Sequence, residues 1–273
     1  MRKLQMLLFA VFSLQLVLSG CANTGKIRYI GRASGVTKNE VTTSMATKPQ
    51  LHYRKRFTFL MAWNGIPIGS VVAEIGDIIR YRGRDVYVVT LITRSNKFLS
   101  KIYKVEDKYI SYVDTETMTS RRYEADRKEG NYRKHVIVEY DFDKNEAIYT
   151  NLTDGSVKRC AIEKDVQDPL SATFYFMTVP VKVDDEIRIT VNLNEKNYKV
   201  FGKVESLNLI KLPGLGSFPA FRIRPYAILG NERFKKGRGW LYVIADKRRY
   251  PLYGVVLIPF GKVTSTLAKV EDI

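Results

Sequence analysis

The residue most clearly suited to covalent chemistry is Cys21, because it follows a segment with the layout of an export signal. Arg2 and Lys3 form a short cationic start, and residues 4–18 form a mostly apolar stretch. A membrane-spanning helix needs about 20 apolar residues, so this stretch is short for one and has the layout of a secretory leader. A cysteine at the end of such a leader offers a thiol for covalent modification.

Leu18-Ser19-Gly20-Cys21 resembles the lipobox of bacterial lipoproteins, in which the leader is removed and the cysteine thiol is joined to diacylglycerol. The resemblance implies that Cys21 is lipidated and begins the mature chain. Several acyl chains anchor a protein durably, since each buried CH₂ contributes about 0.8 kcal/mol. Ala22 resembles the pattern of enterobacterial lipoproteins sent to the outer membrane, so we expect an outer-membrane protein that faces the periplasm. The alternative is an ordinary export signal with an incidental cysteine.

The sequence offers little else for catalysis. It contains two histidines and two cysteines, and it lacks a G-x-S-x-G elbow, an H-E-x-x-H helix, a P-loop and any Cys/His ligand spacing. We therefore expect no cofactor and no metal site. The second cysteine, Cys160, lies in an apparent strand and is expected to be a small core residue. Whether the chain is an enzyme stays open, because a hydrolase can use two carboxylates from separate strands.

The chain is strongly basic, with 45 Lys+Arg against 28 Asp+Glu and a formal net charge of +17. Behind an export signal, nucleic acid is not the expected partner. Phospholipid head groups, lipopolysaccharide phosphates and peptidoglycan carboxylates are the anions available in an envelope, and basic residues are attracted to anionic leaflets. The alternative is that the basic runs are solvated outer faces of strands. The best ligand-binding candidates lie in a glycine-flanked loop: Arg233, Lys235, Lys236 and Arg238.

The elements that must position these residues are mostly β-strands. Ile187–Leu193 and Tyr198–Val204 alternate apolar and polar residues across a short polar link, which predicts a hairpin. Val136–Phe142 begins a similar pair. Asp168–Thr178 predicts the one short helix, with an aspartate N-cap and a proline at the first helical position. The predicted fold is all-β: a single large antiparallel curved sheet, half-barrel or open barrel-like, with one short helix.

These elements divide the chain into three parts. Residues 1–20 are the signal peptide, residues 21–50 a tether, and residues 51–273 a β-rich domain. A flexible tether of about 28 residues would span roughly 30 Å root-mean-square.

Three stretches resemble the bacterial domain-of-unknown-function 3108 family in order and spacing. Residues 63–69 (WNGIPIG) look like its opening turn, residues 168–172 (DPLSA) like its central helix start, and residues 239–252 like its closing segment. The resemblance implies a β-rich, secreted or lipid-anchored envelope protein and carries no established activity. We interpret the motif residues as structural: Gly65, Gly69, Asp168, Ser171, Trp240, Asp246, Arg248 and Pro251.

The favoured function is non-enzymatic binding or carriage of an amphipathic or anionic envelope molecule, by a protein held at the membrane through its N-terminal lipid. The curved sheet would shelter an apolar chain while basic residues meet a lipid, lipopolysaccharide or peptidoglycan group. An assembly protein that docks on another envelope component or on peptidoglycan is the alternative. The hydrolase with carboxylates from separate strands is a second alternative.

Overall fold

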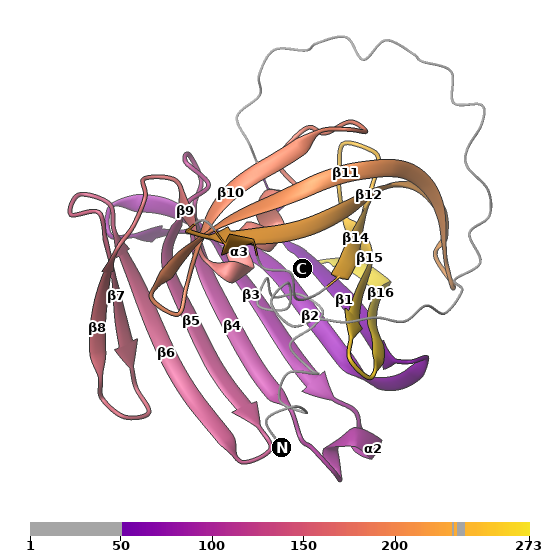
Figure 1. The fold of residues 1–273 in the computed structure, drawn as a ribbon, viewed down its shortest axis with the longest axis horizontal. Coiled ribbons are helices and arrows are strands. Elements are labelled where there is room, and N and C mark those ends of the chain that lie inside the picture. Colours follow the sequence, from indigo (N-terminus) through magenta and orange to yellow (C-terminus); the bar gives the residue numbers. More distant parts are fainter. Residues whose placement is uncertain (1–50, 231, 234–237) are drawn as a thin grey trace.

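A computed structural model of the chain describes residues 51–230, 232–233 and 238–273. In these residues sixteen strands join into one sheet that curls into an open barrel (Figure 1). The strands form where apolar and polar residues alternate. In the strand of residues 55–63, for example, Phe57, Phe59 and Met61 are buried and alternate with more exposed neighbours. The predicted fold class is confirmed.

The elements have the following bounds. The strands are β1 (Lys55–Trp63), β2 (Ile66–Tyr81), β3 (Arg84–Ser95), β4 (Glu106–Asp114), β5 (Ser120–Glu129), β6 (Tyr132–Asp141), β7 (Glu146–Asn151), β8 (Val157–Ala161), β9 (Val166–Gln167), β10 (Glu186–Leu193), β11 (Lys196–Leu212), β12 (Gly216–Leu229), β13 (Glu232–Arg233), β14 (Arg238–Ile244), β15 (Pro251–Ile258) and β16 (Gly261–Asp272). The helices are α2 (Lys97–Ser100) and α3 (Pro169–Tyr175).

The strand order is β8-β7-β6-β5-β4-β3-β2-β1-β16-β15-β14-β12-β11-β10-β9, with β13 beside β12. The first and last strands are therefore neighbours in the middle of the sheet, and β8 and β9 are its two edges. Every pairing is antiparallel except that of β9 with β10, which is parallel. The sheet is antiparallel as predicted apart from this short edge pairing, where the chain reaches β10 through α3 and not through a hairpin.

Helix α3 packs against the core-facing side of the sheet, and its segment contributes side chains to both clusters of the core. Leu170, Phe174 and Met177 pack into the larger cluster, whereas Ala172 and Phe176 pack into the smaller one against β10–β12. One helix was predicted. The second, α2, is only four residues long and is capped by Asn96, so it has no apolar period to detect.

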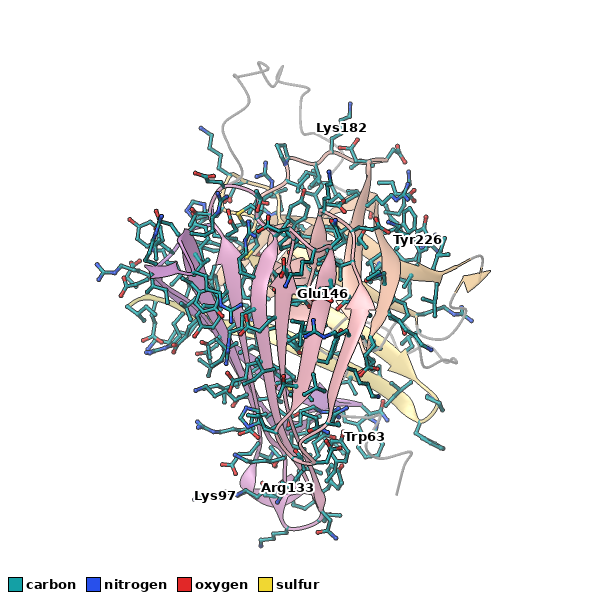
Figure 2. All side chains as sticks on the ribbon, turned by 90° about the vertical axis from the view of Figure 1, so that its left-hand side faces the viewer. Trp63, Lys97, Arg133, Glu146, Lys182 and Tyr226 are labelled. Carbon is teal, nitrogen blue, oxygen red and sulfur yellow. The ribbon has the colours of Figure 1, made fainter. Side chains whose placement is uncertain are left out.

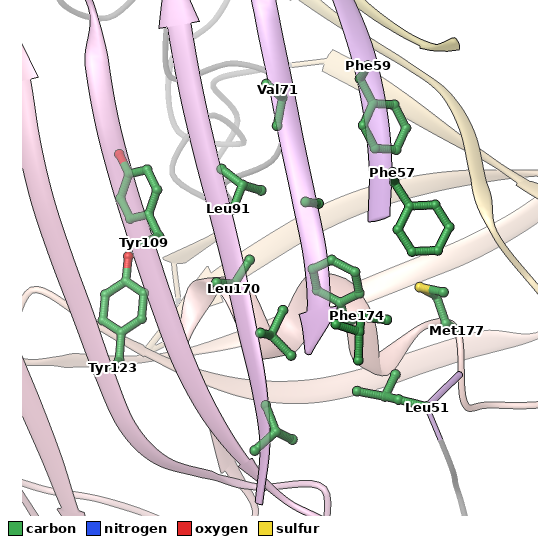
Figure 3. Packing of buried hydrophobic residues seen from close by; sticks show 14 of the residues in the cluster. Leu51, Phe57, Phe59, Val71, Leu91, Tyr109, Tyr123, Leu170, Phe174 and Met177 are labelled. Carbon is green, nitrogen blue, oxygen red and sulfur yellow. The ribbon is translucent and has the colours of Figure 1, made fainter. Parts of the chain in front are cut away.

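The interior of the curl is largely filled by side chains. Phe57, Phe59, Val71 and Leu91 project from neighbouring strands into the larger cluster, and all are almost fully buried (Figure 3). In the described part of the chain, no helix is long and apolar enough to span a membrane.

Ion pairs join β3, β4 and β5 near one end of the barrel. At the end of β4, the buried carboxylate of Asp114 accepts hydrogen bonds from Arg84 (Nε, 2.8 Å) and Arg121 (Nε, 3.0 Å) and from two backbone amides. Burial alone would raise the pKa of Asp114, but these bonds outweigh it and hold the pKa well below its ordinary value.

Candidate functional site

A cavity of about 190 Å³ lies between the core-facing side of β4–β8 and the turn that joins β10 to β11. It is partly open to solvent, and its lining mixes aromatic, apolar, amide and charged side chains. The lining residues are Tyr109, Tyr123, Ala125, Arg127, Lys134, Val136, Val138, Tyr149, Asn151, Asp154, Ser156, Lys158, Asn192, Leu193, Asn194 and Glu195. Such a mixture suits a small polar ligand that also has an apolar face.

The buried side of the cavity is built from tyrosines. The rings of Tyr109 and Tyr123 stack with their centroids 6.4 Å apart (Figure 3). Burial raises the pKa of both phenols well above the ordinary value, so both keep their hydroxyl protons. Tyr149 donates a hydrogen bond of 2.6 Å to Asn192 Oδ1, across the gap between the two ends of the sheet.

Three cations line the same cavity. Arg127 is held by Glu129 at 2.6 Å, and Lys158 lies 3.6 Å from Glu195. Lys134 has no carboxylate within ion-pair distance among the described residues. Hydrogen bonds from Ser156 lower the pKa of Asp154, and the charge of Lys134 adds to that effect. Lys134 is therefore the lining cation best placed to meet an added anion.

Two carboxyl groups are paired beside the cavity. Asp107 on β4 and Glu129 on β5 are both buried, and each carboxyl group affects the pKa of the other. Burial raises the pKa of both groups, that of Glu129 to about 7, against the opposing charge of Arg127. Glu129 Oε2 has no hydrogen-bond partner among the described residues, which agrees with a carboxyl group whose charged form is disfavoured. Neither carboxyl lines the cavity, so this pair does not present the open acidic site that a hydrolase needs.

The cavity sits at a seam where the sheet is joined without a backbone ladder. Besides the contact of Tyr149 with Asn192, Asn197 Nδ2 donates to the backbone oxygen of Ala161 at 2.7 Å. Side chains of β7, β8 and the β10–β11 hairpin thus connect the two ends of the sheet. Cys160 is half-buried at this seam, and its sulfur lies 3.5 Å from Asn192 Nδ2.

Asp168, which the sequence places at the helix start, is fully buried and accepts four hydrogen bonds. Oδ1 accepts from the amides of Leu170 (2.6 Å) and Ser171 (2.9 Å), and Oδ2 accepts from the hydroxyls of Ser111 and Ser120, both at 2.5 Å. Ser171 Oγ completes a capping box by accepting from the Asp168 amide. One carboxylate therefore fastens α3 to β4 and β5.

A family model covers the part of the chain that contains the three motifs. The model of a protein of unknown function, DUF3108, matches residues 58–268. The chain belongs to the DUF3108 family. No curated protein matches the chain.

The DUF3108 fold has counterparts among solved structures. A β-barrel-like protein of the domain of unknown function DUF1849 from Brucella abortus has a TM-score of 0.53 and 8% identity, with 82% of this chain and 99% of that chain covered. An exported protein with a YmcC-like fold from Bacteroides fragilis has a TM-score of 0.35 and 11% identity, covering 81% and 97%. A lipoprotein from Parabacteroides distasonis has a TM-score of 0.36 and 8% identity, covering 81% and 97%. At these identities the likeness to the first shows the fold alone.

The opening motif of the DUF3108 family holds the turn between β1 and β2. Gly65 adopts a φ of +88°, which a side chain would strain. At Gly69 an added Cβ would lie 2.2 Å from the backbone oxygen of Arg94, because β2 and β3 approach closely there.

The closing segment, residues 239–252, contacts neighbouring strands and forms an ion pair within its own turn. Trp240 Nε1 donates to Glu205 Oε2 at 3.0 Å, and the Arg222 guanidinium lies 4.5 Å from the centre of a Trp240 ring. Asp246 pairs with Arg248 at 2.6 Å, and Pro251 is buried at the first position of β15.

The remaining predicted site residues are only partly described. Arg238 is exposed at the first position of β14, and the backbone of Arg233 belongs to β13. Lys235, Lys236 and Cys21 lie outside the described residues. A ligand role for the basic loop and the lipidation of Cys21 thus stay predictions. The sequence did not predict that the cavity-lining residues form one group, because they come from separate strands and a distant turn.

Proposed function

We propose that the chain is a lipid-anchored envelope protein that binds, without catalysis, the small anionic polar head of an envelope molecule in the cavity at the seam. The observation that carries the proposal is the meeting of Arg127, Lys134 and Lys158 in a lining that also holds tyrosines and valines. The cations suit a phosphate or carboxylate, and the rings suit the apolar face of a sugar. Asn151, Asn192 and Asn194 supply further donors and acceptors.

The size of the cavity favours a head group over a whole lipid. Ligand pockets for drug-sized molecules measure about 300–1,000 Å³, whereas this cavity holds about 190 Å³. The apolar interior that a long acyl chain would need is occupied by core side chains and by α3. Binding of a head group is therefore better supported than carriage of an acyl chain within the described domain.

Binding is tested by calorimetric titration of the purified chain with N-acetylmuramic acid and with inorganic phosphate, using neutral N-acetylglucosamine for comparison. We expect the charged probes to bind, and Lys134→Gln to weaken that binding about fivefold, the effect of losing roughly 1 kcal/mol. Lys108→Gln is the matched control, because Lys108 is exposed next to Tyr109 on the opposite face of β4. Equal effects of the two variants, or no binding of either charged probe, would contradict the proposal.

The envelope location is supported by the leader and by the position of Cys21 directly after it. Metabolic labelling with a palmitate analogue should mark the chain in bacterial cells, and Cys21→Ala should remove the label. Cys160→Ala is the control, since that cysteine is expected to carry no lipid. Separation of inner and outer membranes then tests the outer-membrane assignment.

The alternative role, docking on another envelope component, is favoured by one observation. β8 is an edge strand and most of its residues are exposed, so its outer backbone groups are accessible to a partner strand. Photo-crosslinking from the Val157 position in intact cells distinguishes the two roles. A discrete protein adduct would favour docking, and its absence would favour head-group binding.

A further inference from the structure

Large apolar side chains are exposed at one end of the barrel, on turns where polar residues are usual because the turns contact solvent. Ile66 follows the β1–β2 turn, Phe98 and Ile102 belong to α2 and the loop after it, and Phe260 lies in the β15–β16 turn. Each of these four side chains is more than half exposed. We call these four residues the apolar end.

The elements of the apolar end form one continuous surface. Asn64 Nδ2 and Trp63 Nε1 donate to the backbone oxygen of Phe260 at 3.1 and 3.2 Å, which joins the β1–β2 and β15–β16 turns. Asn96 Nδ2 donates to the backbone oxygen of Pro67 at 2.7 Å, which joins the start of α2 to β2. The four apolar side chains are therefore carried by turns that are bonded to one another.

The charges at this end are basic and incompletely paired. Residues 96–104 (NKFLSKIYK) contain three lysines and no acid. Lys104 pairs with Glu106 at 2.7 Å, but Lys97 and Lys101 form no ion pair with any described residue. Figure 2 places Lys97 and Trp63 at the same end of the molecule, with Lys182 at the other.

The opposite end has a different character. There the arginines of the β2–β3 turn are matched by carboxylates: Arg80 pairs with Asp85 at 3.0 Å and Arg82 with Glu139 at 3.1 Å. These two arginines are compensated within the protein, whereas Lys97 and Lys101 remain available to an external anion.

We propose that the apolar end docks on the surface of an anionic phospholipid leaflet. Aromatic and branched apolar side chains enter the head-group region readily, and lysines beside them remain at the phosphate level. Each lysine near an anionic leaflet strengthens binding by about fivefold. Lys97 and Lys101 flank Phe98 and Ile102 in the manner that such an interface requires.

The length of chain before the domain agrees with this orientation. β1 runs nine residues from Lys55 to Trp63 at the apolar end, a distance of about 30 Å at about 3.3 Å per residue, and Leu51 lies just before the start of β1. The expected tether between Cys21 and residue 51 has a reach of about 30 Å. A lipid on Cys21 can therefore lie in the same plane as the apolar end.

Docking is tested with the full mature chain reconstituted in phosphatidylcholine vesicles that contain phosphatidylglycerol and brominated lipid. In a chain with Trp63→Phe and Trp240→Phe, one tryptophan is placed by Phe260→Trp and, in a matched chain, by Val183→Trp. Val183 is exposed beside Lys182 at the other end. We expect at least a twofold loss of fluorescence for Phe260→Trp and little loss for Val183→Trp. Equal quenching at the two positions would overturn the proposal.

Hydrogen exchange of the unmodified chain gives a second measurement that needs no substitution. On addition of the anionic vesicles, exchange should slow in residues 64–67 and 96–104 and stay unchanged in residues 181–185. Slowing of the same segments without vesicles, as protein concentration rises, would assign this end to self-association and overturn the proposal. The cavity at the seam shares none of these residues, so head-group binding and docking can fail independently.

Discussion

Asp168→Ala removes the carboxylate that hydrogen-bonds the start of α3 to β4 and β5, and we expect it to cost a large part of the stability of the domain. The variant loses the helix cap and leaves two buried serine hydroxyls without their acceptor. A cap contributes about 1 kcal/mol, and each hydrogen bond to a buried charged group contributes about 1.5–3 kcal/mol. The free energy of unfolding should fall by about 4–7 kcal/mol, against a total of about 5–15 kcal/mol for a domain.

Asp168→Asn is the matched variant, because it keeps the size of the buried side chain and most of its capacity for hydrogen bonding. The amide oxygen can still accept from the amides of Leu170 and Ser171, and the amide nitrogen can donate to the hydroxyls of Ser111 and Ser120 once these rotate. This variant should lose less than about half of what Asp168→Ala loses. Urea unfolding followed by tryptophan fluorescence and circular dichroism measures both. If Asp168→Ala costs less than about 1 kcal/mol, or if the two variants are equal, the role assigned to this carboxylate is wrong.

Three further predictions concern charge and close packing. The fold raises the pKa of Glu129, so this group stabilises the fold fully below pH 4.5 and the stabilisation is lost as pH rises through about 7. In Glu129→Gln the free energy of unfolding, measured with urea, should therefore depend less on pH across that range. The pKa of Asp114 is lowered in the fold, so this group stabilises the fold fully above its ordinary pKa and the stabilisation is lost as pH falls below that value. Asp114→Asn should lower the free energy of unfolding by about 3 kcal/mol at neutral pH, and its melting temperature should fall less than that of the unmodified chain as pH is lowered. Gly69→Ala should lower the melting temperature more than Gly65→Ala, since an added Cβ collides with the Arg94 carbonyl only at the former; the opposite order would contradict the close approach of β2 and β3.

Much of the fold follows from local sequence pattern. Period-two alternation predicted the β10–β11 hairpin, which the structure has with Leu193 opposite Lys196. It did not single out β5, because the core-facing side of that strand carries Arg127 and Glu129 and the apolar alternation stops at Ala125. A charged pair buried against a neighbouring strand has no signature in one strand alone.

The cavity was less accessible to prediction than the fold. Arg127-Lys128 and Arg133-Lys134 read as basic runs, but strand geometry sends Arg127 and Lys134 into the cavity and their neighbours to the outer face. The alternation itself could have indicated this division. The meeting of these residues with Glu195 could not be predicted, because it depends on how far the sheet curls before its two ends approach.

The pairing of β1 with β16 has a consequence for how the protein is made. Lys55 and Asp272 are bonded across a separation of 217 residues, and closing such a loop costs conformational entropy before any contact repays it. Until β16 has been synthesised, both β1 and β15 expose an unpaired edge. Proteins dominated by such distant pairings fold slowly, on the order of milliseconds to seconds. Folding is therefore completed only after the last strand arrives, and until then the emerging chain depends on protection from aggregation.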